Sequence, residues 1–143
     1  MFNGVPKSVV LASLLGLIPI LMGLASTFNV AIEESLKESF IRIALIYSGF
    51  ILSFMSGCIF YVSSLERERE ILLWFSVAPV LLALLSIVIP FMQSFVLALG
   101  FLVVLEIERK LHKIRALPEW WLKLRFPMTS IVVVLLIFLG FRI

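Results

Sequence analysis

Long apolar stretches separated by short polar ones dominate the pattern of hydrophobic and polar positions along the chain. Five such stretches are present, at residues 8–30, 40–62, 71–89, 91–105 and 126–141. None of them alternates apolar with polar residues, as the strands of a membrane barrel do. Their lengths approach the roughly 20 apolar residues with which a helix crosses a bilayer. The pattern therefore predicts five transmembrane helices.

The composition indicates that lipid, not water, surrounds most of this chain. Of its 143 residues, 62% are hydrophobic, whereas soluble domains are about 45–50% apolar. A water-soluble core of this size has no room for so much apolar surface, and only helices or closed barrels satisfy the backbone within lipid. We therefore predict an all-α integral membrane protein, a helical bundle in which residues 1–143 form a single transmembrane domain.

Pro90 lies between the third and fourth apolar stretches. A single helix over residues 71–105 would be about 52 Å long at 1.5 Å per residue, against roughly 30 Å of hydrocarbon in a bilayer. The proline therefore predicts a tight hairpin between two spans in place of one long bent helix.

The distribution of basic residues predicts the orientation of the five spans. Nine of the twelve lysines and arginines fall before the first span, between the second and third, or between the fourth and fifth, regions that share one side of the membrane: Lys7, Arg67, Arg69, Arg109, Lys110, Lys113, Arg115, Lys123 and Arg125. Because basic loops remain on the inner side, we expect the N-terminus inside and the C-terminus outside.

Residues 106–125 form a polar inner-face segment between the fourth and fifth spans. Ile107, Leu111 and Ile114 share one helical face, which predicts an amphipathic helix that continues the fourth span out of the membrane. We expect its basic residues to contact anionic lipid or an acidic partner: Arg109, Lys110, Lys113, Arg115, Lys123 and Arg125. Trp74, Trp120 and Trp121 fall near predicted interfaces, where tryptophan anchors membrane proteins.

The second span carries a ridge of small residues. Gly49, Ser53 and Gly57 recur at intervals of four and so lie on one helical face, which lets another helix approach closely; Ser48 and Ser56 widen this face. Three occupants remain open: another span of the same chain, a partner protein or second copy, or a lipid.

Catalytic chemistry has little support in this sequence. The predicted span centres contain no Asp, Glu, Lys or His, although such residues mark most ion paths. Cys58 is the only cysteine and His112 the only histidine, and the sequence has none of the common catalytic or phosphate-binding motifs. We therefore expect no enzymatic activity, no cofactor and no metal site. Nucleic acid is not an expected partner, because the basic residues flank membrane spans.

Two segments carry a family resemblance. Residues 47–57 (YSGFILSFMSG) and 117–129 (LPEWWLKLRFPMT) resemble signatures of the small integral membrane proteins typified by transmembrane protein 69. The resemblance implies a bacterial inner membrane or a mitochondrial one, and no established activity. Members often continue the first signature with a His-Trp pair, which this chain lacks. In the second signature, Arg125 is expected at the interface, Pro127 in the first helical turn, and Thr129 bonded back to a carbonyl.

Three functions follow as hypotheses, in order of preference. The first is a non-enzymatic interaction protein, an accessory subunit or assembly aid of a larger inner-membrane complex, for which the resemblance implies a respiratory host. The second is a small transporter or lipid-handling protein, with Pro19 and Pro79 as hinges and the serines of the spans gathered around a polar path. The third is an enzyme that uses His112 and the inner carboxylates. The lipid bilayer and a membrane-protein partner or a second copy are the expected contacts.

Overall fold

Helices make up nearly all of residues 4–28, 32–65 and 70–143, the part of the chain that this computed structural model describes. The elements are α1 (Lys7–Leu15), α2 (Ile18–Ser26), α3 (Glu34–Leu65), α4 (Glu70–Val88), the short 3-10 helix η2 (Pro90–Met92), α5 (Gln93–Lys113) and α6 (Trp121–Arg142). Counting α1 with α2 and η2 with α5, five of these stretches are long and apolar enough to cross a membrane. The prediction of a helical chain with five helices apolar enough to cross a membrane is confirmed over the described residues.

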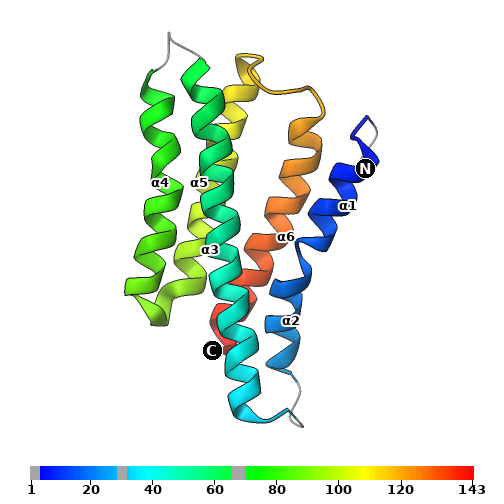
Figure 1. The fold of residues 1–143 in the computed structure, drawn as a ribbon, viewed down its shortest axis with the longest axis vertical. Coiled ribbons are helices and arrows are strands. Elements are labelled where there is room, and N and C mark those ends of the chain that lie inside the picture. Colours follow the sequence, from blue (N-terminus) through cyan, green and yellow to red (C-terminus); the bar gives the residue numbers. More distant parts are fainter. Residues whose placement is uncertain (1–3, 29–31, 66–69) are drawn as a thin grey trace.

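The bundle is built around α3, which packs against α2, α4 and α5, while α6 packs against α5 and α2. Figure 1 shows that the start of α1, the end of α3 with the start of α4, and the loop from α5 to α6 lie at one end of the bundle. The described basic residues before α1 and around the loop from α5 to α6 therefore lie at the same end of the molecule. Arg67 and Arg69 fall outside the described residues.

The first predicted span is broken in its middle. A continuous helix over 8–30 is expected from the sequence, but α1 ends at Leu15 and α2 begins at Ile18. The cause is Pro19, which has no backbone N–H and whose ring clashes with the carbonyl four residues earlier. Leu17 N–H bonds instead to the Leu14 carbonyl at 3.0 Å, in a tight turn. Residues 29 and 30 of this predicted span lie outside the described residues.

The predicted hairpin at Pro90 is present. The chain leaves α4 at Val88, turns through η2 and returns as α5, and Figure 1 shows α4 and α5 side by side. The alternative of one long helix is thereby excluded. Pro79 causes no break in α4, where it lies buried inside the helix.

The predicted inner-face segment 106–125 is divided between two helices and a loop. The amphipathic stretch does continue the fourth span, because α5 extends to Lys113, but α6 already begins at Trp121 and not at 126. Between them, Arg115 adopts a left-handed φ of 60°, and Ala116 N–H bonds to the Leu111 carbonyl. This is the Schellman arrangement that ends many helices. Pro127 is consequently inside α6, not in its first turn as expected.

Candidate functional site

The interior of the bundle contains a carboxylate, that of Glu108. The buried face of α5 includes Leu97, Phe101, Val104 and Leu111, at alternating steps of three and four residues that place them on one side of a helix. Glu108 falls in the same register and its exposed fraction is 0%. A charged group at such a position is tolerated only with a partner, because burying an isolated charge is costly.

The partners of Glu108 come from the first turns of α6. Arg125 donates from Nε to Oε1 and Oε2 of the carboxylate at 3.0 and 3.1 Å. The indole N–H of Trp121 donates to Oε1 at 3.1 Å. Trp121 and Arg125 are four residues apart and therefore project from one face of their helix. We refer to Glu108, Trp121 and Arg125 as the α5–α6 polar cluster, which joins two helices across the loop between them.

Two polar atoms beside the α5–α6 polar cluster have no hydrogen-bond partner among the described residues. They are Nη2 of Arg125 and Oγ1 of Thr129, and both are buried. The expected bond from Thr129 back to a carbonyl of its own helix is therefore wrong. Buried donors and acceptors without partners are rare in folded proteins. Two of them four residues apart on α6 therefore indicate a candidate binding position.

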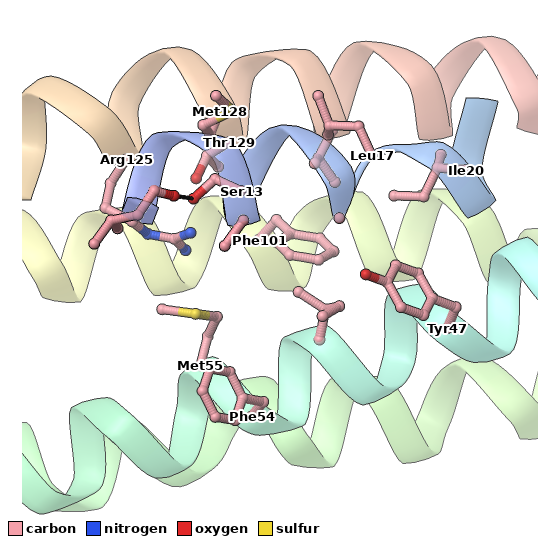
Figure 2. Close-up of a pocket in the computed structure, with 15 residues that line it drawn as sticks. Ser13, Leu17, Ile20, Tyr47, Phe54, Met55, Phe101, Arg125, Met128 and Thr129 are labelled. Atoms are coloured by element: carbon pink, nitrogen blue, oxygen red, sulfur yellow. Dashed lines mark hydrogen bonds between the residues drawn. The ribbon is translucent and has the colours of Figure 1, made fainter. Parts of the chain in front are cut away.

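Both residues line a cavity of about 260 Å³ between α1, α2, α3, α5 and α6. Figure 2 shows the Arg125 guanidinium directed into this space, with Ser13 and Thr129 nearby and Phe101 and Met55 across from it. The wall is otherwise mainly apolar, with residues such as Leu17, Ile20, Ile51, Met128 and Val132. We call this space the Arg125 cavity.

The basic residues predicted to meet lipid or a partner divide into two groups. Five of them are exposed: Arg109, Lys110, Lys113, Arg115 and Lys123. Arg109 pairs with Glu106 at 3.1 Å, and Lys110 lies 6.0 Å from the centre of the Phe75 ring. Arg125 differs from the expectation, because its side chain is only 14% exposed and forms an ion pair with Glu108. Its position on the inward face of α6 therefore removes it from the predicted headgroup surface.

The three predicted tryptophan anchors also lie in different surroundings. Trp74 is 74% exposed on α4, as an anchor would be. Trp120 and Trp121 are half-buried, with ring centroids 5.6 Å apart. Trp121 thus uses its N–H within the protein, in the α5–α6 polar cluster, and not at a lipid headgroup as expected.

The small-residue ridge on α3 is only partly covered by the described residues. A Cβ added at Gly57 would have nothing within 4 Å, and one at Gly49 would meet only Leu97 at 3.9 Å. Gly57 is exposed, while Gly49 and Ser53 are half-buried. Ser48 and Ser56, expected to widen this face, are instead buried, and Ser56 donates to the Ser76 carbonyl of α4. Among the three occupants left open, no other span in the described part of the chain covers Gly57.

The serines of the spans do not gather around a common path. Ser13, Ser26, Ser48, Ser53, Ser76 and Ser86 each donate to a carbonyl three or four residues earlier in the same helix. Only Ser13 of this set lines the Arg125 cavity. The position of these serines therefore gives no support to a serine-lined transport path. Across the described ranges, no group of three or more His, Cys, Asp or Glu residues is placed to hold a metal ion.

From the sequence, Glu108 counts only among the inner carboxylates of the enzyme hypothesis, on the polar face of an amphipathic helix. Its burial was not predicted, although a signal for it was available. Its spacing from Leu97, Phe101, Val104 and Leu111 continues the apolar stripe of α5 without interruption. A carboxylate inside such a stripe indicates a partner from another helix.

Comparison with known proteins adds the family. The model of a family described as "Protein of unknown function (DUF3429)" matches residues 5–141. No curated protein and no solved structure gives a match. The matched range covers α1 to α5 and α6 up to Phe141, and so includes the α5–α6 polar cluster, the walls of the Arg125 cavity and the ridge on α3. The chain, with its five helices apolar enough to cross a membrane, therefore belongs to this family of unknown function.

Proposed function

We propose that this protein is a non-enzymatic membrane interaction protein, an accessory subunit or assembly aid of a larger inner-membrane complex. The observation that carries the proposal is the outward position of Gly57 on α3, with the half-buried Gly49 two turns before it. Phe50 and Phe54, 69% and 65% exposed, lie on the same side of the helix. Gly57 lies on this side between Phe54 and Tyr61, which is 66% exposed, and its missing side chain leaves a shallow hollow into which a partner helix fits.

The contrast with the other helical glycines supports this interpretation. A Cβ at Gly23 would lie 2.4 Å from Ala44 Cβ, one at Gly100 would lie 2.4 Å from Leu52, and one at Gly140 would lie 2.8 Å from Phe95. Those three glycines thus permit close packing within the chain. Gly49 and Gly57 have no such internal reason, although glycine inside a helix costs about 1 kcal/mol relative to alanine. A close contact outside the chain supplies the missing reason.

The membrane and the orientation are part of the same proposal. Resemblance to the family typified by transmembrane protein 69 supports a bacterial inner membrane or a mitochondrial inner membrane, and a respiratory complex as the host. Segregation of basic residues supports an inner N-terminus and an outer C-terminus. The five exposed basic residues around the end of α5 then face an inner surface rich in anionic lipid.

The partner contact predicts the outcome of a pull-down. The chain carries a C-terminal tag, is expressed at native level, is solubilised in mild detergent, and its companions are identified by mass spectrometry. We expect a stoichiometric set of membrane subunits with the natural chain. Changing Gly49, Ser53 and Gly57 together to leucine fills the hollow, and we expect at least a tenfold loss of those subunits.

A matched control adds bulk to outward faces elsewhere. Val88 on α4 and Val134 on α6 are 72% and 54% exposed, and the double variant V88L/V134L is expected to retain the partners. Melting of each variant in detergent reports whether it is folded. Recovery of the natural chain as a lone monomer would contradict the proposal, as would equal recovery from the triple variant.

The orientation has its own test. Ala116 lies in the loop between α5 and α6, and Cys58 is the only natural cysteine. The test uses a background in which Cys58→Ser removes the natural cysteine. We expect a cysteine introduced by Ala116→Cys to react with a membrane-impermeant maleimide only after the membrane is permeabilised. A cysteine introduced at Arg142 is expected to react in intact cells or mitoplasts. The reverse labelling pattern would refute the N-in, C-out arrangement.

A further inference from the structure

The Arg125 cavity combines an apolar wall with unmet hydrogen-bonding groups at one point. Nη2 of Arg125 and Oγ1 of Thr129 are both buried there without a partner in the described residues. Thr129 is only 2% exposed. A guanidinium nitrogen can only donate, and a threonine hydroxyl can donate as well. The two groups together therefore suit a ligand that presents an acceptor oxygen.

The charge balance restricts what kind of oxygen that is. Arg125 is the only charged residue among those lining the cavity, and the Glu108 carboxylate already neutralises it through two bonds at 3.0 and 3.1 Å. An anionic headgroup placed beside this pair would leave one negative charge without compensation in an apolar surrounding, which is costly. An uncharged carbonyl accepts the same hydrogen bonds without that cost.

The shape indicates how a ligand enters. The volume of about 260 Å³ is slightly below the roughly 300–1,000 Å³ typical of small-molecule sites, so it holds a headgroup and the first part of a tail. Ala12 and Phe54, which belong to the lining of the cavity, are exposed on α1 and α3. Because these outer faces lie within predicted membrane spans, the tail would continue between α1 and α3 into the lipid.

We propose that the Arg125 cavity binds an uncharged lipid-soluble molecule, whose carbonyl oxygen accepts hydrogen bonds from Arg125 and Thr129. The carbonyl belongs either to a quinone ring with an apolar tail or to the ester of a neutral lipid. The site does not depend on the partner contact proposed for α3, because Gly49, Ser53 and Gly57 are not among the residues that line the cavity, although Phe54 borders both surfaces. Either proposal can therefore fail without the other.

The test uses the full chain, purified in detergent, and three probes. They are a benzoquinone with a ten-carbon tail, dioctanoylglycerol and decanoate, and the readout is the melting temperature as a function of probe concentration. We expect one of the two neutral carbonyl probes to raise the melting temperature in a saturable manner. Which of them does so distinguishes a ring carbonyl from an ester carbonyl. Decanoate, an anion, is expected to have little effect.

Variants connect any binding to the named groups. Thr129→Val keeps the shape of the side chain but removes its hydroxyl, and Arg125→Lys keeps the charge beside Glu108 but removes the second guanidinium nitrogen. Each is expected to weaken binding about tenfold, the effect of one lost hydrogen bond. Ser13→Leu adds bulk to the wall from α1 and is expected to abolish the effect of the probe.

Loss of binding can be distinguished from loss of folding. Thr129→Val removes an unmet polar atom, so this variant is expected to fold at least as well as the natural chain even if Arg125→Lys does not. Absence of any saturable shift with both neutral probes would overturn the proposal. It would also be overturned if decanoate bound more tightly than either, or if Thr129→Val and Ser13→Leu left the shift unchanged, since the probe would then be dissolving in detergent or in the outer surface.

Discussion

Replacing Glu108 with alanine is expected to lower the free energy of unfolding by about 3–5 kcal/mol, as is usual when one partner of a buried ion pair is removed. The carboxylate has an exposed fraction of 0% and accepts from Arg125 and Trp121. Its loss leaves the guanidinium charge and the indole N–H without partners in an apolar surrounding. Denaturation of the purified chain in detergent, followed by tryptophan fluorescence, measures the change.

Two controls make this result specific. Glu119→Ala changes an exposed carboxylate in the nearby loop and is expected to shift stability by less than about 0.5 kcal/mol. The double variant Glu108→Leu, Arg125→Leu removes both charges, and such replacements are often neutral or stabilising. We therefore expect it to recover most of the lost stability. If Glu108→Ala cost no more than Glu119→Ala, the buried pair would not be a feature of the folded protein.

Gly23→Ala is expected to destabilise the bundle by about 1–3 kcal/mol, the usual penalty for overpacking a close contact. The added Cβ would lie 2.4 Å from Ala44 Cβ and 3.2 Å from the Phe40 carbonyl oxygen. Neither atom can move without shifting the backbone of α3, because one is the first side-chain atom and the other is main chain. Thermal melting in detergent provides the measurement.

The same substitution at Gly57 is expected to have the opposite sign. Nothing lies within 4 Å of a Cβ at that position, so alanine adds helix propensity without a clash and stabilises the isolated chain by up to about 1 kcal/mol. The pair of variants therefore tests which glycines pack inside the chain. Equal effects at Gly23 and Gly57 would contradict the arrangement of α2 against α3.

The α5–α6 polar cluster and the proposed ligand share the side chain of Arg125. The α5–α6 polar cluster is a stability element first, since it compensates a carboxylate that α5 would otherwise bury alone. Nη2 of Arg125 and the hydroxyl of Thr129 are buried without a partner in the described residues and are therefore left for a ligand. Variants at Glu108 therefore test the fold, whereas Thr129→Val tests binding with little effect on the fold.

Several features of this protein could be predicted from the chain alone, because they depend on short segments and on lipid. A helix that crosses a bilayer needs a run of apolar residues whatever its neighbours are, so the number of spans followed from hydropathy. The hairpin at Pro90 followed from length, since one helix over that stretch would far exceed the hydrocarbon thickness. The gathering of the described basic loops at one end followed from the alternation of five spans.

Tertiary structure decided what individual side chains do. Glu108 and Arg125 are 17 residues apart, and whether a carboxylate in an apolar stripe is buried depends on donors that another helix brings to it. Likewise, the interval of four between Gly49, Ser53 and Gly57 places them on one helical face, but only the packing of α2, α4 and α5 around α3 determines that Gly57 points outward. Local sequence specifies helices and their ends through backbone chemistry and hydropathy, whereas burial and pairing of side chains require the positions of residues far away in the chain.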